Sequence, residues 1–183
     1  KWDSYIEKQS GPTNQKEPSY AHAIGAIYRN ADSSDIVVTA AGGLVGETVQ
    51  IWKPKKINTF ETEWGFSCMG YEISGALGIK MAKPDQDVIV FIGDGSYLLA
   101  NSDIYSSVIY DQKLIIIVCD NGGHMVINRL QLAKGGKEYI CNLRAARATN
   151  LQFVDFAAHA KSMGAESEAV SSTSELEAAF LRA

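Results

Sequence analysis

The sequence is poor in cysteine, and its cysteines follow no metal-binding or disulfide pattern. Cys68, Cys119 and Cys141 are odd in number and lack the paired spacing of a zinc site. Cys119 ends an apolar run that is typical of a buried strand. We therefore expect free thiols, as in a reducing cytoplasm, and a cytoplasmic protein.

Further absences narrow the class of protein. No apolar stretch approaches the roughly 20 residues that span a membrane. The chain opens with polar residues, without the apolar core of a secretion signal. The formal net charge of −4 gives no electrostatic basis for binding nucleic acid. We therefore expect neither a membrane nor a nucleic acid as a partner.

An ordinary globular composition surrounds one strongly patterned stretch. The 183 residues are 46% hydrophobic and 21% charged, enough for one domain with a real core. Two continuous apolar runs, Val88–Ile92 and Leu114–Cys119, flank a segment of helical length over residues 97–110. Such runs are typical of strands buried on both faces. We predict a three-layer, doubly wound, mainly parallel α/β sheet with helices on both faces.

Polar turns rich in glycine follow both apolar runs. The first is Gly93-Asp94-Gly95-Ser96 and the second is Asp120-Asn121-Gly122-Gly123. In a βαβ unit both strands end at one edge of the sheet, where open α/β sheets bind ligands. The carboxylate of Asp94 and the amide oxygen of Asn121 suit magnesium or calcium that shares its shell with phosphate. Each turn alone is also an ordinary strand-ending sequence, so the pair carries the argument.

Two strand-to-helix junctions can meet an anion. The amides of Gly95, Ser96 and Tyr97 open the helix predicted after the first run. A predicted strand over residues 36–40 ends in Ala41-Gly42-Gly43, before a short helix over residues 44–51. The residues alone leave open whether this second junction is an anion site or a plain turn.

The spacing of the two turns resembles the fingerprint of thiamin-diphosphate-dependent enzymes. In that family a GDG sequence precedes an Asn pair at the distance found here, with residues 96–119 between. The resemblance implies that Asp94, Asn121 and the backbone carbonyl of Gly123 hold Mg²⁺, which holds the diphosphate. This sequence departs from the family at Asp120, where an Asn is usual. The ligand is the second member of the pair, so we expect no loss of the metal.

A second family feature precedes the GDG sequence. Residues 65–70, GFSCMG, resemble the segment whose bulky apolar residue bends the cofactor. The resemblance implies that Met69 lies beneath thiamin diphosphate and that the Ser67 carbonyl accepts from its 4′-amino group. A core methionine is the structural alternative. The remaining implied cofactor contacts are Ala41, Gly42, Gly43, Gly93, Gly95, Ser96, Tyr97 and His124.

Longer strings point to one branch of this family. AAGGLVGE, EWGFSCMGYEISGALGIKMA, GDGSYLLANS and NRLQ most resemble the inositol-catabolism enzymes that hydrolyse a C–C bond of a cyclic 1,2-diketone. The implied substrate is a trihydroxycyclohexanedione and the product is 5-deoxyglucuronate. Two alternatives stay open: an acetohydroxyacid-synthase-like carboligase or decarboxylase domain, and a non-catalytic cofactor-binding fragment.

The family also needs a glutamate at N1′ of the cofactor, on a separate pyrimidine-binding domain. No segment here resembles that domain, and Glu47, Glu61, Glu63 and Glu72 lie outside the expected context. We therefore expect no catalytic residue in this chain and no activity from it alone. Residues 1–18 are predicted to be a linker, and residues 19–183 the C-terminal diphosphate-binding domain of a longer enzyme. The missing pyrimidine domain is the expected partner, within a homodimer or tetramer.

Outside the central unit, several elements are predicted from periodicity. Helices are expected over residues 19–31, 68–81, 124–132, 154–163 and 174–183, the last with Ser174 as its N-cap. An edge strand is expected over residues 165–170, and residues 52–62 are expected to be irregular. Residues 122–148, the covering segment, are expected to fold over the cofactor. Met69, Tyr71 and Tyr97 are expected on an exposed apolar surface that the missing domain covers.

Overall fold

The computed structural model describes residues 1–145, 147–148, 150 and 152–183. Within them, one parallel sheet has the strand order β2-β1-β3-β4. Val90 of β3 is in register with Val38 of β1 and Ile116 of β4, so β3 is an inner strand. The strands are β1 (Ile36–Thr39), β2 (Phe60–Thr62), β3 (Val88–Gly93) and β4 (Ile115–Cys119).

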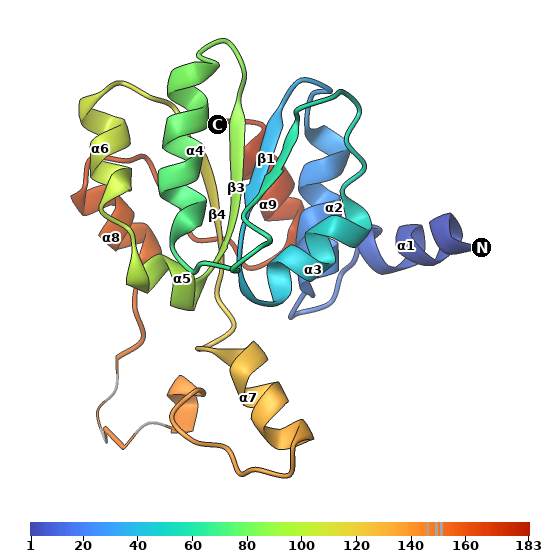
Figure 1. The fold of residues 1–183 in the computed structure, drawn as a ribbon, viewed down its shortest axis with the longest axis vertical. Helices are drawn as coiled ribbons and strands as arrows, with labels where there is room; N and C mark the ends of the chain where they lie inside the picture. Colours follow the sequence, from blue (N-terminus) through green and yellow to red (C-terminus); the bar gives the residue numbers. More distant parts are fainter. Residues whose placement is uncertain (146, 149, 151) are drawn as a thin grey trace.

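Helices cover both faces of the sheet, which confirms the predicted three-layer class (Figure 1). Val37, Ile89 and Phe91 face a layer of α2 (Tyr20–Asn30), α3 (Gly42–Ile51) and α9 (Thr173–Phe180). The alternate strand residues, such as Val38 and Val90, face a layer of α4 (Tyr71–Ala82), α6 (Asp103–Ile109) and α8 (Phe156–Ser162). Alternation along each strand buries both faces, as the continuous apolar runs predicted.

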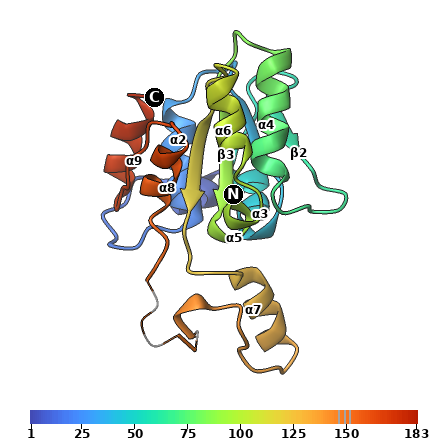
Figure 2. The same cartoon turned by 90° about the vertical axis from the view of Figure 1, so that its left-hand side faces the viewer.

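The strands point toward one edge, at the bottom of Figure 1. From there β1 leads into α3, β3 into α5 (Asp94–Leu99), and β4 into α7 (Met125–Ala133). Helix α7 and the short helix η1 (Leu143–Ala145) extend away from the sheet in both views (Figures 1 and 2). This edge carries the turns that the sequence singled out.

The helix predicted over residues 97–110 is two helices, α5 and α6. Asn101 ends α5, because its Nδ2 donates to the Tyr97 carbonyl at 3.0 Å. Asp103 starts α6, where its carboxylate accepts from the Ser106 hydroxyl at 3.0 Å. Residues 60–62, predicted irregular, pair with β1 as the edge strand β2.

The structure also differs from the expected linker over residues 1–18. Helix α1 (Trp2–Ser10) occupies half of it and packs on α2, with Ile6 buried in the core. A Cβ on Gly25 would lie 1.9 Å from the Ser10 carbonyl oxygen, so the two backbones meet at a glycine. Arg29 Nη1 donates to the same oxygen at 2.7 Å. The polar composition of residues 1–18 indicated a linker instead of this helix, because most side chains of α1 face solvent.

Two predictions near the C-terminal end are wrong. Helix α9 has Ser172 as its N-cap, not Ser174, because the Ser172 hydroxyl accepts from the Glu175 amide at 3.2 Å. Residues 165–170 form no strand; a groove of about 860 Å³ separates them from β4. Among the described residues, no helix is long and apolar enough to cross a membrane.

Candidate functional site

Asp94 and Gly123 meet at the ends of neighbouring strands. Asp94 is 2% exposed, and its Oδ2 accepts from the Gly123 amide at 2.7 Å. Gly123 has a φ of +136°, and a Cβ there would lie 2.3 Å from the Cys141 carbonyl oxygen. Only glycine fits this conformation and this close approach. The structure therefore brings together two of the three predicted metal ligands.

Asn121, the third predicted ligand, has an oxygen without a partner. Its Oδ1 is buried and makes no hydrogen bond with the described residues, while its Nδ2 donates to the hydroxyl of Tyr20. A buried amide oxygen left unpaired costs free energy, so natural proteins rarely leave one without a ligand or water. Carboxylate, amide and carbonyl oxygens are the donors that Mg²⁺ prefers. The residues present fit a magnesium ion.

The electrostatics of this corner favour a cation. Burial raises the pKa of the Asp94 carboxyl above its usual value, and the neighbouring charge of Asp120 raises it further. The Gly123 amide opposes both effects by donating to the carboxylate. Asp120 Oδ1 accepts from the Gly122 amide at 2.9 Å. A divalent cation would relieve the repulsion between the two carboxylates.

Cys119 lies next to this corner as a neutral thiol. Burial raises its pKa to about 12, and the charge of Asp94 adds to the effect. Cys68, Cys119 and Cys141 are all free, as predicted.

The turn from Ala41 to Gly43 opens α3 without a side-chain cap. The first amides of this ten-residue helix therefore lack a side-chain acceptor, which leaves them available to an anion. A Cβ on Gly43 would lie 3.2 Å from Arg129 Nη2 and 3.4 Å from Tyr20 Cε2. Arg129 comes from α7, so the covering segment reaches this turn.

Three more predicted cofactor residues gather at the start of α5. A Cβ on Gly95 would lie 2.7 Å from His124 Nδ1 and 3.4 Å from Met69 Cε. Met69 is 38% exposed, which argues against its being a core methionine. The side chains of Met69 and His124 therefore face the backbone of the GDG turn.

The loop that carries Ser67 is shaped by Glu63. The Glu63 carboxylate accepts from the amides of Phe66 at 2.9 Å and Cys68 at 2.7 Å. These bonds lower the pKa of Glu63 below its usual value. Ser67 has a φ of +52°, which is uncommon outside glycine. Glu63 thus supports the backbone whose Ser67 carbonyl was predicted to contact the cofactor.

Tyr97 points away from this edge. Its side chain is fully buried, its ring packs edge-on against Phe156, and its hydroxyl lies 2.9 Å from His159 Nδ1. The expectation of an exposed Tyr97 is therefore wrong, because α8 covers it. Met69 and Tyr71 are more than a third exposed, as expected. Tyr97 therefore contributes its backbone, and not its side chain, to the start of α5, where it follows Gly95 and Ser96.

Glu72 links the turns, a role that the sequence did not reveal. It is fully buried, and its carboxylate accepts from the amides of Ala41 at 3.3 Å and Gly70 at 2.8 Å. The Ser96 hydroxyl is a third partner. Burial raises the pKa of Glu72 despite these bonds. A glutamate in the first turn of a mostly apolar helix was the available signal.

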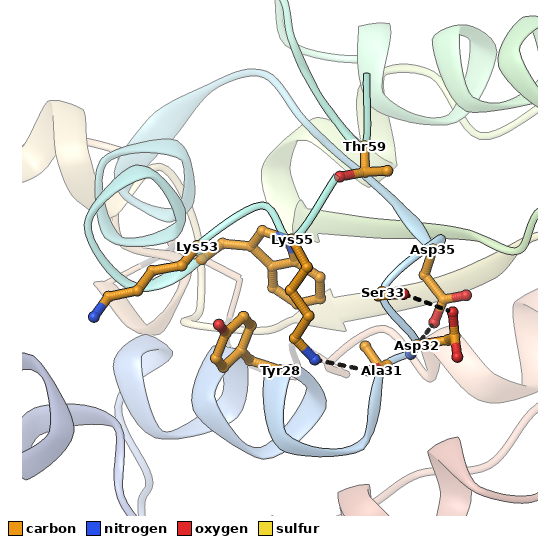
Figure 3. A pocket seen from close by; sticks show the side chains of 9 residues that line it. Tyr28, Ala31, Asp32, Ser33, Asp35, Lys53, Lys55 and Thr59 are labelled. Atoms are coloured by element: carbon orange, nitrogen blue, oxygen red, sulfur yellow. Dashed lines mark hydrogen bonds between the residues drawn. The ribbon is translucent and has the colours of Figure 1, made fainter. Parts of the chain in front are cut away.

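The small pocket in Figure 3 lies at the opposite edge of the sheet. Residues that precede β1 and β2 line it together with side chains from α2 and from the segment after α3: Tyr28, Ala31, Asp32, Ser33, Asp35, Trp52, Lys53, Lys55 and Thr59. Its volume is about 10 Å³, enough for roughly one water. It brings no group near the GDG turn and plays no part in the candidate site.

Comparison with known proteins shows which family this sequence resembles. Residues 40–183 match the family model described as "Thiamine pyrophosphate enzyme, C-terminal TPP binding domain", where thiamine pyrophosphate is thiamin diphosphate. Proteins named 3D-(3,5/4)-trihydroxycyclohexane-1,2-dione hydrolase are similar. The one from Halalkalibacterium halodurans is 39% identical over 91% of this chain and 26% of its own length. The Bacillus subtilis relative is 36% identical over 86% and 25%, and the Listeria innocua relative 40% over 83% and 24%.

This chain spans about a quarter of the length of these curated relatives. The match begins directly after β1 and covers β2, β3 and β4, both turns and the Met69 loop, which the site requires. The chain therefore belongs to the thiamine pyrophosphate enzymes, as a C-terminal TPP-binding domain.

Proposed function

We propose that this chain binds the Mg²⁺–diphosphate half of thiamin diphosphate. Asp94, Asn121 and the Gly123 carbonyl would hold the metal. The observation that carries this proposal is the buried, unpaired Oδ1 of Asn121, two residues from the amide that bonds Asp94. The Gly123 carbonyl accepts from the Met125 amide at 3.0 Å and keeps a second lone pair for a cation.

The backbone around the metal corner would bind the diphosphate. The amides of Gly42 and Gly43 begin α3 after the N-cap Ala41, whose own amide donates to Glu72, and those at Gly93, Gly95, Ser96 and Tyr97 surround the GDG turn. Met69, His124 and the Ser67 carbonyl are proposed to contact the rest of the cofactor. When bound, thiamin diphosphate supplies the carbon nucleophile, and the chain supplies binding, orientation and electrostatics.

For the longer protein, we propose hydrolysis of a C–C bond of a trihydroxycyclohexane-1,2-dione, giving 5-deoxyglucuronate in cytoplasmic inositol catabolism. The printed names of three relatives with 36–40% identity support this substrate. The chain alone is expected to be inactive. A pyrimidine-binding domain is the proposed partner, in a homodimer or tetramer that covers Met69 and Tyr71, each more than a third exposed.

Replacing Asp94 by Ala tests the metal site. The variant should lose Mg²⁺-dependent binding of thiamin diphosphate by more than the roughly 10–100-fold that loss of an outer-shell partner costs. Isothermal titration calorimetry with and without Mg²⁺ measures this. The control is Asp85→Ala, because Asp85 is an exposed carboxylate before β3, at the other edge of the sheet. Equal affinities in all three proteins would refute the assignment.

The substrate requires a separate experiment. Turnover of the cyclic diketone should appear only when this chain is combined with a pyrimidine-binding chain. Product analysis with the diketone and with pyruvate then separates ring hydrolysis from carboligation. Ring opening by the 183-residue chain alone would contradict the need for a partner.

A further inference from the structure

The geometry points to Tyr20 as the positioning residue of the metal site: its hydroxyl holds the Asn121 amide so that the amide oxygen faces the cation. This inference rests on the proposed function. Tyr20 lies 101 positions before Asn121 in the sequence, on α2, outside residues 40–183 that the family model matches.

The chemistry of an amide makes its orientation decisive. A carboxamide carries an acceptor oxygen at one end and a donor NH₂ at the other, and only the oxygen ligates a cation. Here Nδ2 donates to the Tyr20 hydroxyl, and Oδ1 is left buried without a partner in the described structure. The hydroxyl thus holds the end of the amide that cannot bind metal.

Tyr20 is itself held from two sides. It is the first residue of α2, directly after the N-cap Ser19, which forms a reciprocal capping box with His22. Its ring packs beside Gly43, where an added Cβ would lie 3.4 Å from Cε2. Because the chain fixes Tyr20 without a ligand, the amide is oriented before the cation arrives.

A purely structural role would predict something different. If the hydroxyl only contributed to folding, its loss would lower the stability of the chain and leave metal affinity unchanged. If it positions Asn121, its loss leaves a buried NH₂ without its acceptor. The amide then turns to find water, and Oδ1 leaves the metal site.

The test titrates Mg²⁺ into the 183-residue chain at saturating thiamin diphosphate, by calorimetry. Tyr20→Phe should weaken Mg²⁺ binding about tenfold, the effect of one hydrogen bond to a buried group. The thermal unfolding midpoint without ligands is measured in parallel and should fall by no more than the loss of one buried hydrogen bond explains. Tyr28→Phe is the matched control, because it removes a hydroxyl from the same helix, about two turns after Tyr20, where the ring packs against Trp52.

Repeating the titration with Asn121→Asp isolates the positioning role. A carboxylate has two oxygens and no N–H, so its orientation needs no acceptor. Tyr20→Phe should then weaken Mg²⁺ binding less than it does with Asn at position 121, and the double-mutant cycle should show coupling between the two positions.

The outcomes separate the two hypotheses. No Mg²⁺-dependent binding by the unsubstituted chain overturns the proposed function. Binding that is unchanged in Tyr20→Phe overturns the role of Tyr20 alone. Weakening of equal size with Asn and with Asp at position 121 also overturns it, because that result reports a general structural effect.

Discussion

The carboxyl edge of the sheet and the covering segment differ in how firmly the chain holds them. The edge is formed in part by the end of β3, whose residues Val88 to Ile92 are completely buried. In the covering segment, α7 buries Asn128, while Ile127 and Leu130 are more than half exposed. Regions with few buried apolar contacts open locally at low free energy. The Asp94 turn is therefore anchored in the core, and the order of the covering segment depends on what binds it.

The largest test of this difference compares two apolar truncations. Ile89→Ala, in β3, should lower the free energy of unfolding by about 3–5 kcal/mol, because it leaves a cavity in the core. Leu130→Ala, on α7, should change it by less than about 0.5 kcal/mol. Urea unfolding of both variants measures this. Similar losses would show that α7 packs as tightly as the sheet.

A second pair of substitutions tests how tightly the chain packs at the point where the covering segment leaves the sheet. Gly123→Ala should cost about 2–3 kcal/mol in unfolding free energy, because its Cβ overlaps the Cys141 carbonyl at an unfavourable φ. Gly135→Ala also has a positive φ, of +81°, but its Cβ meets nothing within 4 Å. That variant should cost only about 1 kcal/mol. Equal costs would mean that the contact with Cys141 contributes nothing.

The smallest expected effect is a pH dependence at Glu72. Because burial raises its pKa in the folded state above the usual 4.5, Glu72 contributes stability that is present at low pH and lost as the pH rises through the folded pKa. The unfolding free energy of the natural chain, minus that of Glu72→Gln, should therefore increase as the pH falls from 8 toward 4.5.

Glu63→Gln provides a control of opposite sign. The pKa of Glu63 is lowered by backbone hydrogen bonds, so its contribution is present above its usual pKa and is lost on acidification. Unfolding measured from pH 8 to well below 4.5 should show the Glu72 contribution growing as the pH falls toward 4.5, and the Glu63 contribution falling only below 4.5. Parallel slopes would contradict the assigned causes.

The sequence was sufficient where local pattern and burial agree. The runs that became β3 and β4 predicted a parallel sheet, and their turns predicted which residues meet at its edge. The roles of Asp94, Asn121 and Met69 toward a cofactor stay predictions, but the structure brings their segments together.

The features that the sequence did not reveal depend on contacts between residues far apart in the chain or on weak local patterns. Tyr20 and Asn121 lie 101 positions apart in the sequence, and the periodicity of apolar residues within one segment cannot indicate such a contact. Helix α1 is polar apart from a few residues, so its docking on Gly25 required knowledge of α2. The break between α5 and α6 lies at Asn101, whose side chain bonds the Tyr97 carbonyl. The sequence pattern of residues 97–110 was equally compatible with one uninterrupted helix.

The packing of α2 has a consequence for the order of folding. Arg29, on the helix that carries Tyr20, forms an ion pair with Glu177 of α9 at 2.6 Å, across 148 positions. Closing so long a loop carries a large entropy cost and slows the formation of non-local contacts. Strands β3 and β4, separated by one helical connection, are able to pair much earlier. During synthesis, β3 and β4 are therefore expected to pair, with Asp94 beside Gly123, before α2 packs on α9.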